Sequence, residues 1–233
     1  MALAAKGEPV IAVAGFYGAP RILSIVVAYN SPIKTVSDLK GKLIGMASTG
    51  GSQTEWLTRR LAVQEGWGVD GVRRVGLGGF EADVAALKTH NVDAIVAGTE
   101  AGLMLEERNE GRILTGFEKY ARDYHSLVIF ARQPLLQANA ALVDRFLKGF
   151  FASIAFVKAN KAKTTDIAMR VLNQSQAVMD KTYDDEVALL SDDGHFDAKA
   201  LDLMKDSFVE MGLLATRPTD NELFTAQFLP VKP

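Results

Sequence analysis

The sequence predicts an α/β fold with a mainly parallel sheet in its first half and a helical C-terminal part. Short runs rich in β-branched residues alternate with helical patterns as far as Phe117. Several of these runs are apolar on successive residues, which is typical of strands buried on both faces. After Arg132 the strand signals stop and helical patterns continue to the C-terminus. This order is the signature of strand–helix–strand units followed by a helical segment.

The strand predictions rest on short apolar runs bounded by glycine, proline and small polar residues. Seven strands are expected, at Val10–Phe16, Ile22–Tyr29, Leu43–Ala47, Val72–Leu77, Asp93–Ala97, Ile113–Phe117 and Ser126–Ala131.

The helix predictions rest on capping residues and on the helical spacing of apolar residues. Thr35–Asp38 reads as a capping box that opens a short helix closed by Gly41, and Ser52 opens a helix that runs to about Glu65. The other expected helices are Phe80–His90, Thr99–Glu110, Asn139–Asn160, Thr164–Asn173, Thr182–Leu190, Asp197–Met211 and Thr219–Phe228. Capping-box spacing also occurs at Thr182–Asp185 and at Thr219–Glu222.

Composition narrows the class of function. The chain has 233 residues, 48% of them hydrophobic and 23% charged, which is ordinary for a globular protein of one large or two small domains. A net charge of −2 provides no electrostatic argument for a nucleic-acid partner. The chain has no cysteine, which excludes disulfides, thiolate catalysis and cysteine-ligated metal, and its three histidines stand far apart. No cofactor and no metal site are therefore expected.

The turn after the third predicted strand is the first candidate ligand site. It contains Ser48, Thr49, Gly50, Ser52 and Gln53 at the start of a predicted helix. Open α/β sheets bind ligands at the carboxyl ends of their strands, where helix N-termini present unpaired N–H groups to anions. Two interpretations stay open, since these residues either only cap the helix or also hold a small anion or carboxylate.

Two further strand-to-helix turns join the candidate site. Gly79 and Phe80 follow the fourth strand, and Thr99 and Glu100 follow the fifth. Thr99 has a hydroxyl that suits a helix cap or a ligand. Phe80 is explained better by packing than by covering a ligand, and Glu100 is explained better by the helix dipole than by pairing with a ligand amine. Tyr17 follows the first strand and is the last candidate ligand-binding residue.

The signals for catalysis are weak. Asp123, Tyr124 and His125 are consecutive, so their side chains diverge on an extended chain, and no GxSxG nucleophile elbow accompanies them. The turn at Ser48 lacks the lysine of a P-loop and the spacing of a dinucleotide-binding motif. No catalytic residue is predicted.

Four segments carry recognisable motifs, namely SPIKTVSDLKGKLIG at Ser31–Gly45, the hydroxyl-rich turn Ser48–Ser52, VGLGG at Val75–Gly79 and AALKTHNVDA at Ala85–Ala94. Together they resemble the solute-binding proteins of ABC importers, most closely the nitrate/sulfonate/taurine (NMT1-like) group. The first segment is similar to a characteristic stretch of that family, and the hydroxyl-rich turn resembles the ligand turn that follows it. The last two segments match two further family patterns, although His90 and Asn91 stand where a glycine is usual.

The resemblance implies a periplasmic-binding-protein-like (type II) fold of two α/β lobes, with a ligand in the cleft between them. On that template residues 1–34 form part of lobe 1 and a crossover strand, 35–115 form lobe 2, and 116–233 return to complete lobe 1. Family members usually begin with two more strand–helix units and a signal peptide, so we expect an incomplete first lobe that favours a homo-oligomer. The implied partners are a small anionic or zwitterionic ligand and a membrane permease, and the implied location of the parent protein is the periplasm.

Two alternatives remain from the resemblance. Thiamine-precursor synthases and menaquinone-pathway enzymes are similar in architecture, so an enzyme on the same fold is the first alternative. The former usually carry a cysteine-rich motif, which this chain lacks. The second alternative is a ligand-sensing domain of a regulator, which would be fused to a DNA-binding or signalling module.

Overall fold

The computed structural model describes residues 1–18 and 22–232. The chain forms two compact units. Unit 1 comprises residues 1–19, 123–166 and 186–233, and unit 2 comprises residues 20–122 and 167–185. The division predicted from the sequence has its boundaries at residues 34/35 and 115/116. Among the described residues, no helix combines the length and the apolar character needed to cross a membrane.

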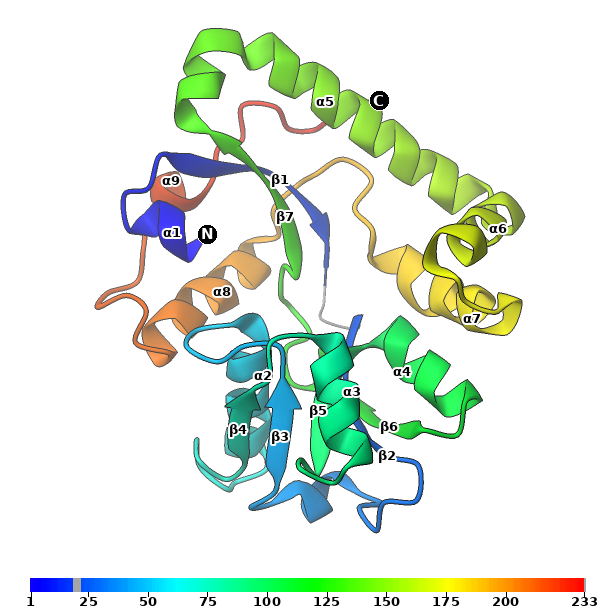
Figure 1. Cartoon of the computed structure of the whole chain (residues 1–233). Helices are drawn as coiled ribbons and strands as arrows, with labels where there is room; N and C mark the ends of the chain where they lie inside the picture. The colour runs from blue at the N-terminus through cyan, green and yellow to red at the C-terminus, as the bar shows by residue number, and fades with distance from the viewer. Residues whose placement is uncertain (19–21, 233) are drawn as a thin grey trace. The chain divides into compact units, whose positions relative to one another are not determined.

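Unit 2 is built on a five-stranded mixed sheet of order β4-β3-β5-β2-β6. Its strands are β2 (Leu23–Ala28), β3 (Leu43–Met46), β4 (Arg73–Gly76), β5 (Ala94–Gly98) and β6 (Gly111–Gly116). β3 pairs in parallel with β4 and β5, as the strand–helix alternation predicts. β2 lies between β5 and β6 and is antiparallel to both, so it alone runs against the other strands (Figure 1). The predicted mainly parallel sheet is correct for β3, β4 and β5, and the insertion of β2 makes the whole sheet mixed.

Helices cover the sheet of unit 2. They are η2 (Val36–Leu39), α2 (Gln53–Gln64), α3 (Phe80–Lys88), α4 (Thr99–Glu107), η3 (Phe117–Lys119) and α7 (Gln176–Glu186). α6 (Lys161–Leu172) spans the boundary between the units. The capping box of Thr35 is confirmed, because the Asp38 carboxylate accepts hydrogen bonds from the N–H and hydroxyl of Thr35 at 2.8 and 3.0 Å.

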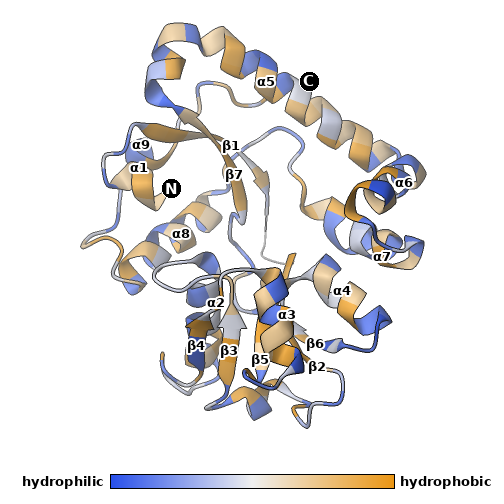
Figure 2. Cartoon of the chain, in the orientation of Figure 1, coloured by the Kyte–Doolittle hydropathy of each residue, from blue (hydrophilic) through white to orange (hydrophobic). Residues whose placement is uncertain are grey.

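The core of unit 2 lies between β2, β5 and the helices α3 and α4. Buried side chains include Val26, Ile95 and Leu105. The strand β5 is coloured largely as hydrophobic in Figure 2. Gly102 of α4 allows that helix to approach the sheet, since a Cβ there would lie 2.8 Å from the Ile113 Cγ1 atom. Close packing of this kind determines where α4 starts and therefore where the turn after β5 lies.

Unit 1 contains a two-stranded antiparallel sheet of β1 (Val10–Tyr17) and β7 (Leu127–Arg132). Its helices are α1 (Ala2–Ala5), α5 (Gln133–Ala159), η4 (Val187–Leu189), α8 (Ala198–Glu210) and α9 (Asp220–Leu223). The short helix α1 has no counterpart in the sequence predictions. The core of unit 1 lies between the sheet and α5, and it contains the buried side chains of Val13, Leu147, Phe151 and Ile154.

All seven predicted strands are present, and three of the helix predictions need correction. The helix predicted from Asn139 begins earlier, at Gln133, with proline in its first turn. Asn139 nevertheless acts as a cap, because it has non-helical backbone angles and its Oδ1 accepts a hydrogen bond from the Leu142 N–H at 3.1 Å. The structure therefore contains two helical segments joined at a kink.

The other two corrections concern helix ends. Thr182 lies inside α7 rather than at its start, and Ser175 caps this helix by accepting a hydrogen bond from the Val178 N–H at 3.2 Å. The capping box at Thr219 is confirmed, but α9 ends at Leu223 instead of Phe228. Phe224 is extended and forms a bridge to Ala12 of β1, so a tertiary backbone contact ends the helix.

One buried carboxylate stands out in the core of unit 2. Asp83 of α3 is 2% exposed, and its Oδ1 has no hydrogen-bond partner among the described residues. Burial raises the pKa of Asp83 to about 6 from an ordinary value of 3.8. Between these two pH values the folded chain binds the proton more tightly than the unfolded chain. The contribution of Asp83 to stability is therefore present at low pH and is lost as the pH rises towards 6.

We expect the isosteric change Asp83→Asn to increase the free energy of unfolding at neutral pH by about 1–2 kcal/mol. The increase should shrink as the pH falls through 6 and should vanish below 3.8, where Asp83 becomes protonated in both states. Urea denaturation across this pH range measures the difference. Glu81→Gln, at an exposed carboxylate on the same helix, is the matched control. If Asp83→Asn is less stable than the parent chain at neutral pH, the raised pKa of Asp83 is contradicted.

Candidate ligand-binding site

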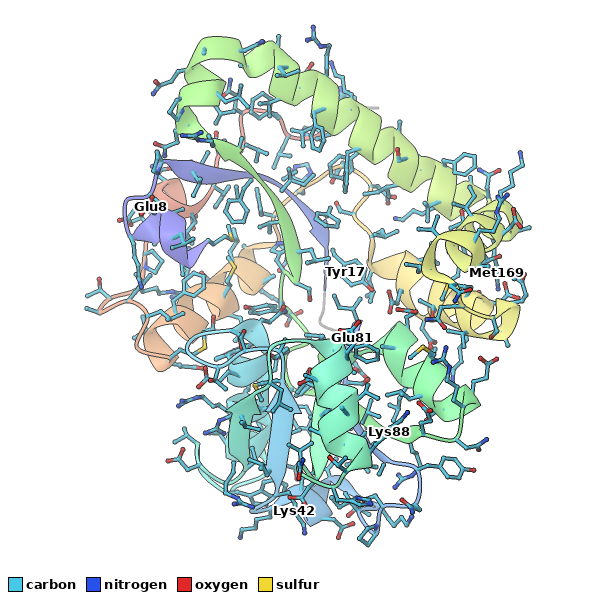
Figure 3. All side chains as sticks on the ribbon, in the orientation of Figure 1. Glu8, Tyr17, Lys42, Glu81, Lys88 and Met169 are labelled. Atoms are coloured by element: carbon cyan, nitrogen blue, oxygen red, sulfur yellow. The ribbon has the colours of Figure 1, made fainter. Side chains whose placement is uncertain are left out.

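The three candidate turns of unit 2 lie at one edge of its sheet. β3, β4 and β5 are parallel, so their carboxyl ends meet at that edge, where α2, α3 and α4 begin (Figure 1). Nine of the ten predicted site residues belong to these turns. Tyr17 belongs to unit 1, where it ends β1 and is 5% exposed (Figure 3).

The turn between β3 and α2 is held by its own side chains. Ser52 is the N-cap of α2, as predicted, and its hydroxyl accepts a hydrogen bond from the Glu55 N–H at 3.2 Å. The same hydroxyl donates to the Ser48 carbonyl oxygen at 2.7 Å. These contacts fix the path of the loop, so the capping role of this stretch is real.

An internal carboxylate occupies the backbone cradle of this turn. Glu55 Oε2 accepts hydrogen bonds from the N–H groups of Gly50 and Gly51 at 2.7 and 2.9 Å. Both glycines have positive φ, at 88° and 104°, which directs their N–H groups towards Glu55. Arg59 pairs with the second oxygen of Glu55 at 2.8 Å. Gly50 was predicted as a ligand residue, but its N–H group already has a partner within the chain.

The pKa of Glu55 reflects this environment. Burial raises it, but hydrogen bonds from Gly51, Arg59 and Gly50 together hold it below its usual range. Glu55 is therefore a carboxylate in the folded chain, and it plays the part that an anionic ligand would play at a free helix N-terminus.

The remaining groups of this turn are available for a ligand. Ser48 and Thr49 are exposed. Gln53 is half-buried, and its side-chain Nε2 is buried without a hydrogen-bond partner in the described part of the chain. A buried donor without an acceptor is unfavourable, so a ligand oxygen next to Gln53 would be stabilising.

The turn between β4 and α3 adds backbone groups and an apolar side chain to this edge of the sheet, but no polar side chain among its predicted site residues. Gly79 is the N-cap of α3 and has no side chain to cap it. Phe80 packs against the core cluster of unit 2, which is the packing role that a helix-start aromatic most often has. Asp83 lies one turn further along α3, and sequence analysis missed it. A single aspartate in a helical pattern carries no signal of its burial.

The turn between β5 and α4 differs from the prediction in one respect. Gly98 is the N-cap of α4, so Thr99 is the first residue of the helix and does not cap it. Glu100 is half-buried. Burial raises the pKa of Glu100, while a hydrogen bond from the Gln174 side chain lowers it by less. This edge of the sheet therefore contains carboxyl groups that favour either the neutral form or a positively charged partner.

His125 is held by the backbone and not by a catalytic partner. Its Nε2 accepts a hydrogen bond from the Asp197 N–H at 2.8 Å, and its ring packs edge-on against Phe196. Burial lowers the pKa of His125, although the charge of Asp197 acts in the opposite direction. Tyr124 is also buried, whereas Asp123 is exposed. These contacts account for His125 as a structural residue of unit 1.

Comparison with known proteins supports the resemblance. The family model described as NMT1/THI5 like matches residues 1–164. No curated protein gives a significant match. Among solved structures, the alkanesulfonate-binding protein SsuA from Xanthomonas axonopodis pv. citri, bound to MOPS, has a TM-score of 0.79 at 20% identity, over 95% of this chain and 76% of that chain.

Two further structures show the range of proteins with this fold. The periplasmic aliphatic sulphonate-binding protein SsuA from Escherichia coli has a TM-score of 0.76 at 22% identity, over 95% of this chain and 70% of that chain. A mutant of DSZB in complex with biphenyl-2-sulfinic acid has a TM-score of 0.68 at 16% identity, over 95% of this chain and 78% of that chain. At these identities the structural likeness shows the fold. With the family match covering more than half of its length, this chain has the periplasmic-binding-protein fold and belongs to the NMT1/THI5-like family.

Proposed function

We propose that the chain is the solute-binding component of an ABC importer and captures a small anionic or zwitterionic molecule. Family membership and the fold shared with two SsuA proteins support this proposal. On this reading the parent protein works in the periplasm and passes its ligand to a membrane permease. The protein holds the ligand and performs no chemistry on it.

The observation that carries the proposal is the meeting of three strand-to-helix turns at one edge of the unit 2 sheet. The exposed hydroxyls of Ser48 and Thr49 and the unpartnered amide of Gln53 are neutral hydrogen-bond donors. Such donors suit the oxygen atoms of nitrate, sulfonates and carboxylates alike. Because Glu55 already fills the backbone cradle, we assign ligand recognition at this turn to side chains.

An enzyme on the same fold is the second candidate. The desulfurization enzyme DSZB is the observation that favours it, with a TM-score of 0.67 over 95% of this chain. Incubating the protein with biphenyl-2-sulfinic acid and measuring consumption of that compound tests this candidate directly. Turnover would replace the binding proposal, whereas binding without turnover supports it.

We also propose that the chain self-associates through unit 1. A groove of about 440 Å³ lies along β7 and the start of α5. Its exposed apolar side chains are Phe130, Leu135, Leu142 and Phe146, which are 37–56% exposed. β7 pairs only with β1 among the described strands, so its second edge is open. An open antiparallel edge beside an apolar groove is self-complementary, and we infer that a second copy covers it.

A ligand screen tests the binding proposal. We expect nitrate, taurine, an alkanesulfonate or an aromatic carboxylate to raise the melting temperature, since a ligand at a hundredfold excess over Kd adds about 2.7 kcal/mol of stability. The shift should disappear in Gln53→Leu combined with Ser48→Ala. Gln53→Leu removes a buried donor that has no partner among the described residues, so the variant should remain folded.

The matched control is Ser153→Ala, at an exposed hydroxyl of α5 in unit 1 that bonds within its own helix. This variant should keep the full ligand shift. A shift that survives in the double variant would move the site away from the turn after β3. No shift with any of these ligands, from a folded protein, would overturn the binding proposal.

Light scattering over a dilution series tests self-association. We expect a concentration-dependent dimer that Phe146→Ser converts to a monomer, because this change removes apolar surface from the groove. Phe156→Ser is the control on the same helix, since Phe156 is 42% exposed and does not line the groove. A parent chain that is monomeric at every concentration would contradict the prediction.

A further inference from the structure

A second cavity, distinct from the groove of unit 1, lies within unit 2 and is lined by residues of β2, β6, α4 and α7. Figure 1 shows α7 beside α4. The volume of the cavity is about 380 Å³, which is within the range of small-molecule sites. Its polar and charged lining residues are Ser24, Thr99, Glu106, Glu118, Lys181 and Asp185. α7 is packed onto α4 beside it, through Val178, Met179 and Leu103.

Ser24 is a buried polar group directed to this cavity. It is 2% exposed, and its Oγ has no hydrogen-bond partner among the described residues. Val26 stands two positions further along β2 and packs towards α4, since a Cβ at Gly102 would lie 3.3 Å from its Cγ2. Alternate residues of a strand face the same side, so Ser24 also faces the α4 side, where the cavity lies. Ser24 does not belong to the three turns of the proposed anion site, and its hydroxyl makes no hydrogen bond in the described core.

Glu118 is brought to the same place by Gly116. Gly116 of β6 is directly opposite Ser24 of β2. The Glu118 carboxylate lies where a side chain at position 116 would be, because a Cβ built there would collide with it. Directly opposed residues of an antiparallel pair point to the same face. The Glu118 carboxylate and the Ser24 hydroxyl therefore line the cavity from the same side of the sheet.

The remaining charged residues make the cavity acidic. Glu106, Glu118 and Asp185 contribute three carboxylates, against the single ammonium group of Lys181. Glu106 is oriented by the Ile113 N–H, which donates to its Oε1 at 2.8 Å. Leu103 and Ile113 add an apolar wall.

The arrangement of these carboxylates favours an organic cation over a metal ion. In the described part of the chain, no group of three or more histidine, cysteine, aspartate or glutamate residues has a geometry that holds a metal ion. An organic cation needs no tight ligand shell, because its ammonium group donates up to three hydrogen bonds and its alkyl stem lies on apolar surface.

We propose that this cavity binds a small aliphatic amine in its protonated form. The ammonium group donates to the Glu118 carboxylate and to the Ser24 hydroxyl, and the alkyl stem packs against Leu103 and Ile113. Ser24 then gains the hydrogen-bond partner that it lacks among the described residues. Thr99 lines this cavity and also belongs to the turn after β5. The amine site uses no residue of the turn after β3, so it would remain if the proposed anion recognition there failed.

Butylamine and butan-1-ol are the probes, since they have similar size and differ in charge. Titration of the whole chain, followed by backbone amide chemical shifts, should show saturable binding of butylamine centred on residues of the cavity. Glu118→Gln should weaken this binding about tenfold, because it removes a charged acceptor but keeps the shape. Butan-1-ol should bind to the parent chain no more tightly than butylamine binds to Glu118→Gln.

Ser24→Ala adds a readout that a structural role would not produce. It should weaken butylamine binding about threefold and leave the urea midpoint unchanged or higher, because the lost hydroxyl has no partner among the described residues. Glu8→Gln is the charge-matched control, at an exposed carboxylate of unit 1 (Figure 3). The proposal is overturned if butylamine does not bind, if butan-1-ol binds equally well, or if Glu8→Gln and Glu118→Gln have the same effect.

Discussion

Unit 2 depends on the close packing of Val26, in the strand that runs against the rest of its sheet. Val26 is fully buried, with Gly102 of α4 and Gly111 of β6 as neighbours. A Cβ at Gly102 would lie 3.3 Å from Val26 Cγ2, and a Cβ at Gly111 would lie 2.9 Å from its Cγ1. The glycines are needed because the interior has no room for another atom. This contact sets the height of α4 above the sheet and, with it, the positions of Thr99 and of the cavity beneath α7.

The turn after β3 shows how one stretch of sequence serves two purposes. Small and hydroxyl-bearing residues make the cap and the tight loop, and Glu55 neutralises the positive end of α2 from within the chain. The loop is thus ordered before any ligand arrives, which lowers the entropic cost of binding. An anionic ligand would have to displace Glu55 to reach the backbone amides, so side-chain donors are the simpler means of recognition.

Unit 2 places carboxyl groups where their charge is poorly solvated. Burial raises the pKa values of Asp83 and Glu100, and neither gains a cationic partner among the described residues that restores them. Glu106, Glu118 and Asp185 add negative charge around the cavity. The carboxylates around the cavity attract a positive group, whereas the neutral donors of the turn after β3 favour oxygen atoms. The cavity therefore favours a cation, whereas the side-chain donors of the turn after β3 favour an anion.

Local physics allowed the sequence by itself to determine the seven strands, the capping boxes of Thr35 and Thr219, and the N-cap role of Ser52. Periodicity and capping depend on residues within a few positions of one another. Only the tertiary structure decided the direction of β2, the end of α9 at its bridge to β1, and the pairing of Ser24 with Gly116. It also decided that Glu55 fills the cradle and that Asp83 and Glu118 lie where they do. These features depend on contacts between distant segments, and no local pattern encodes which segments meet.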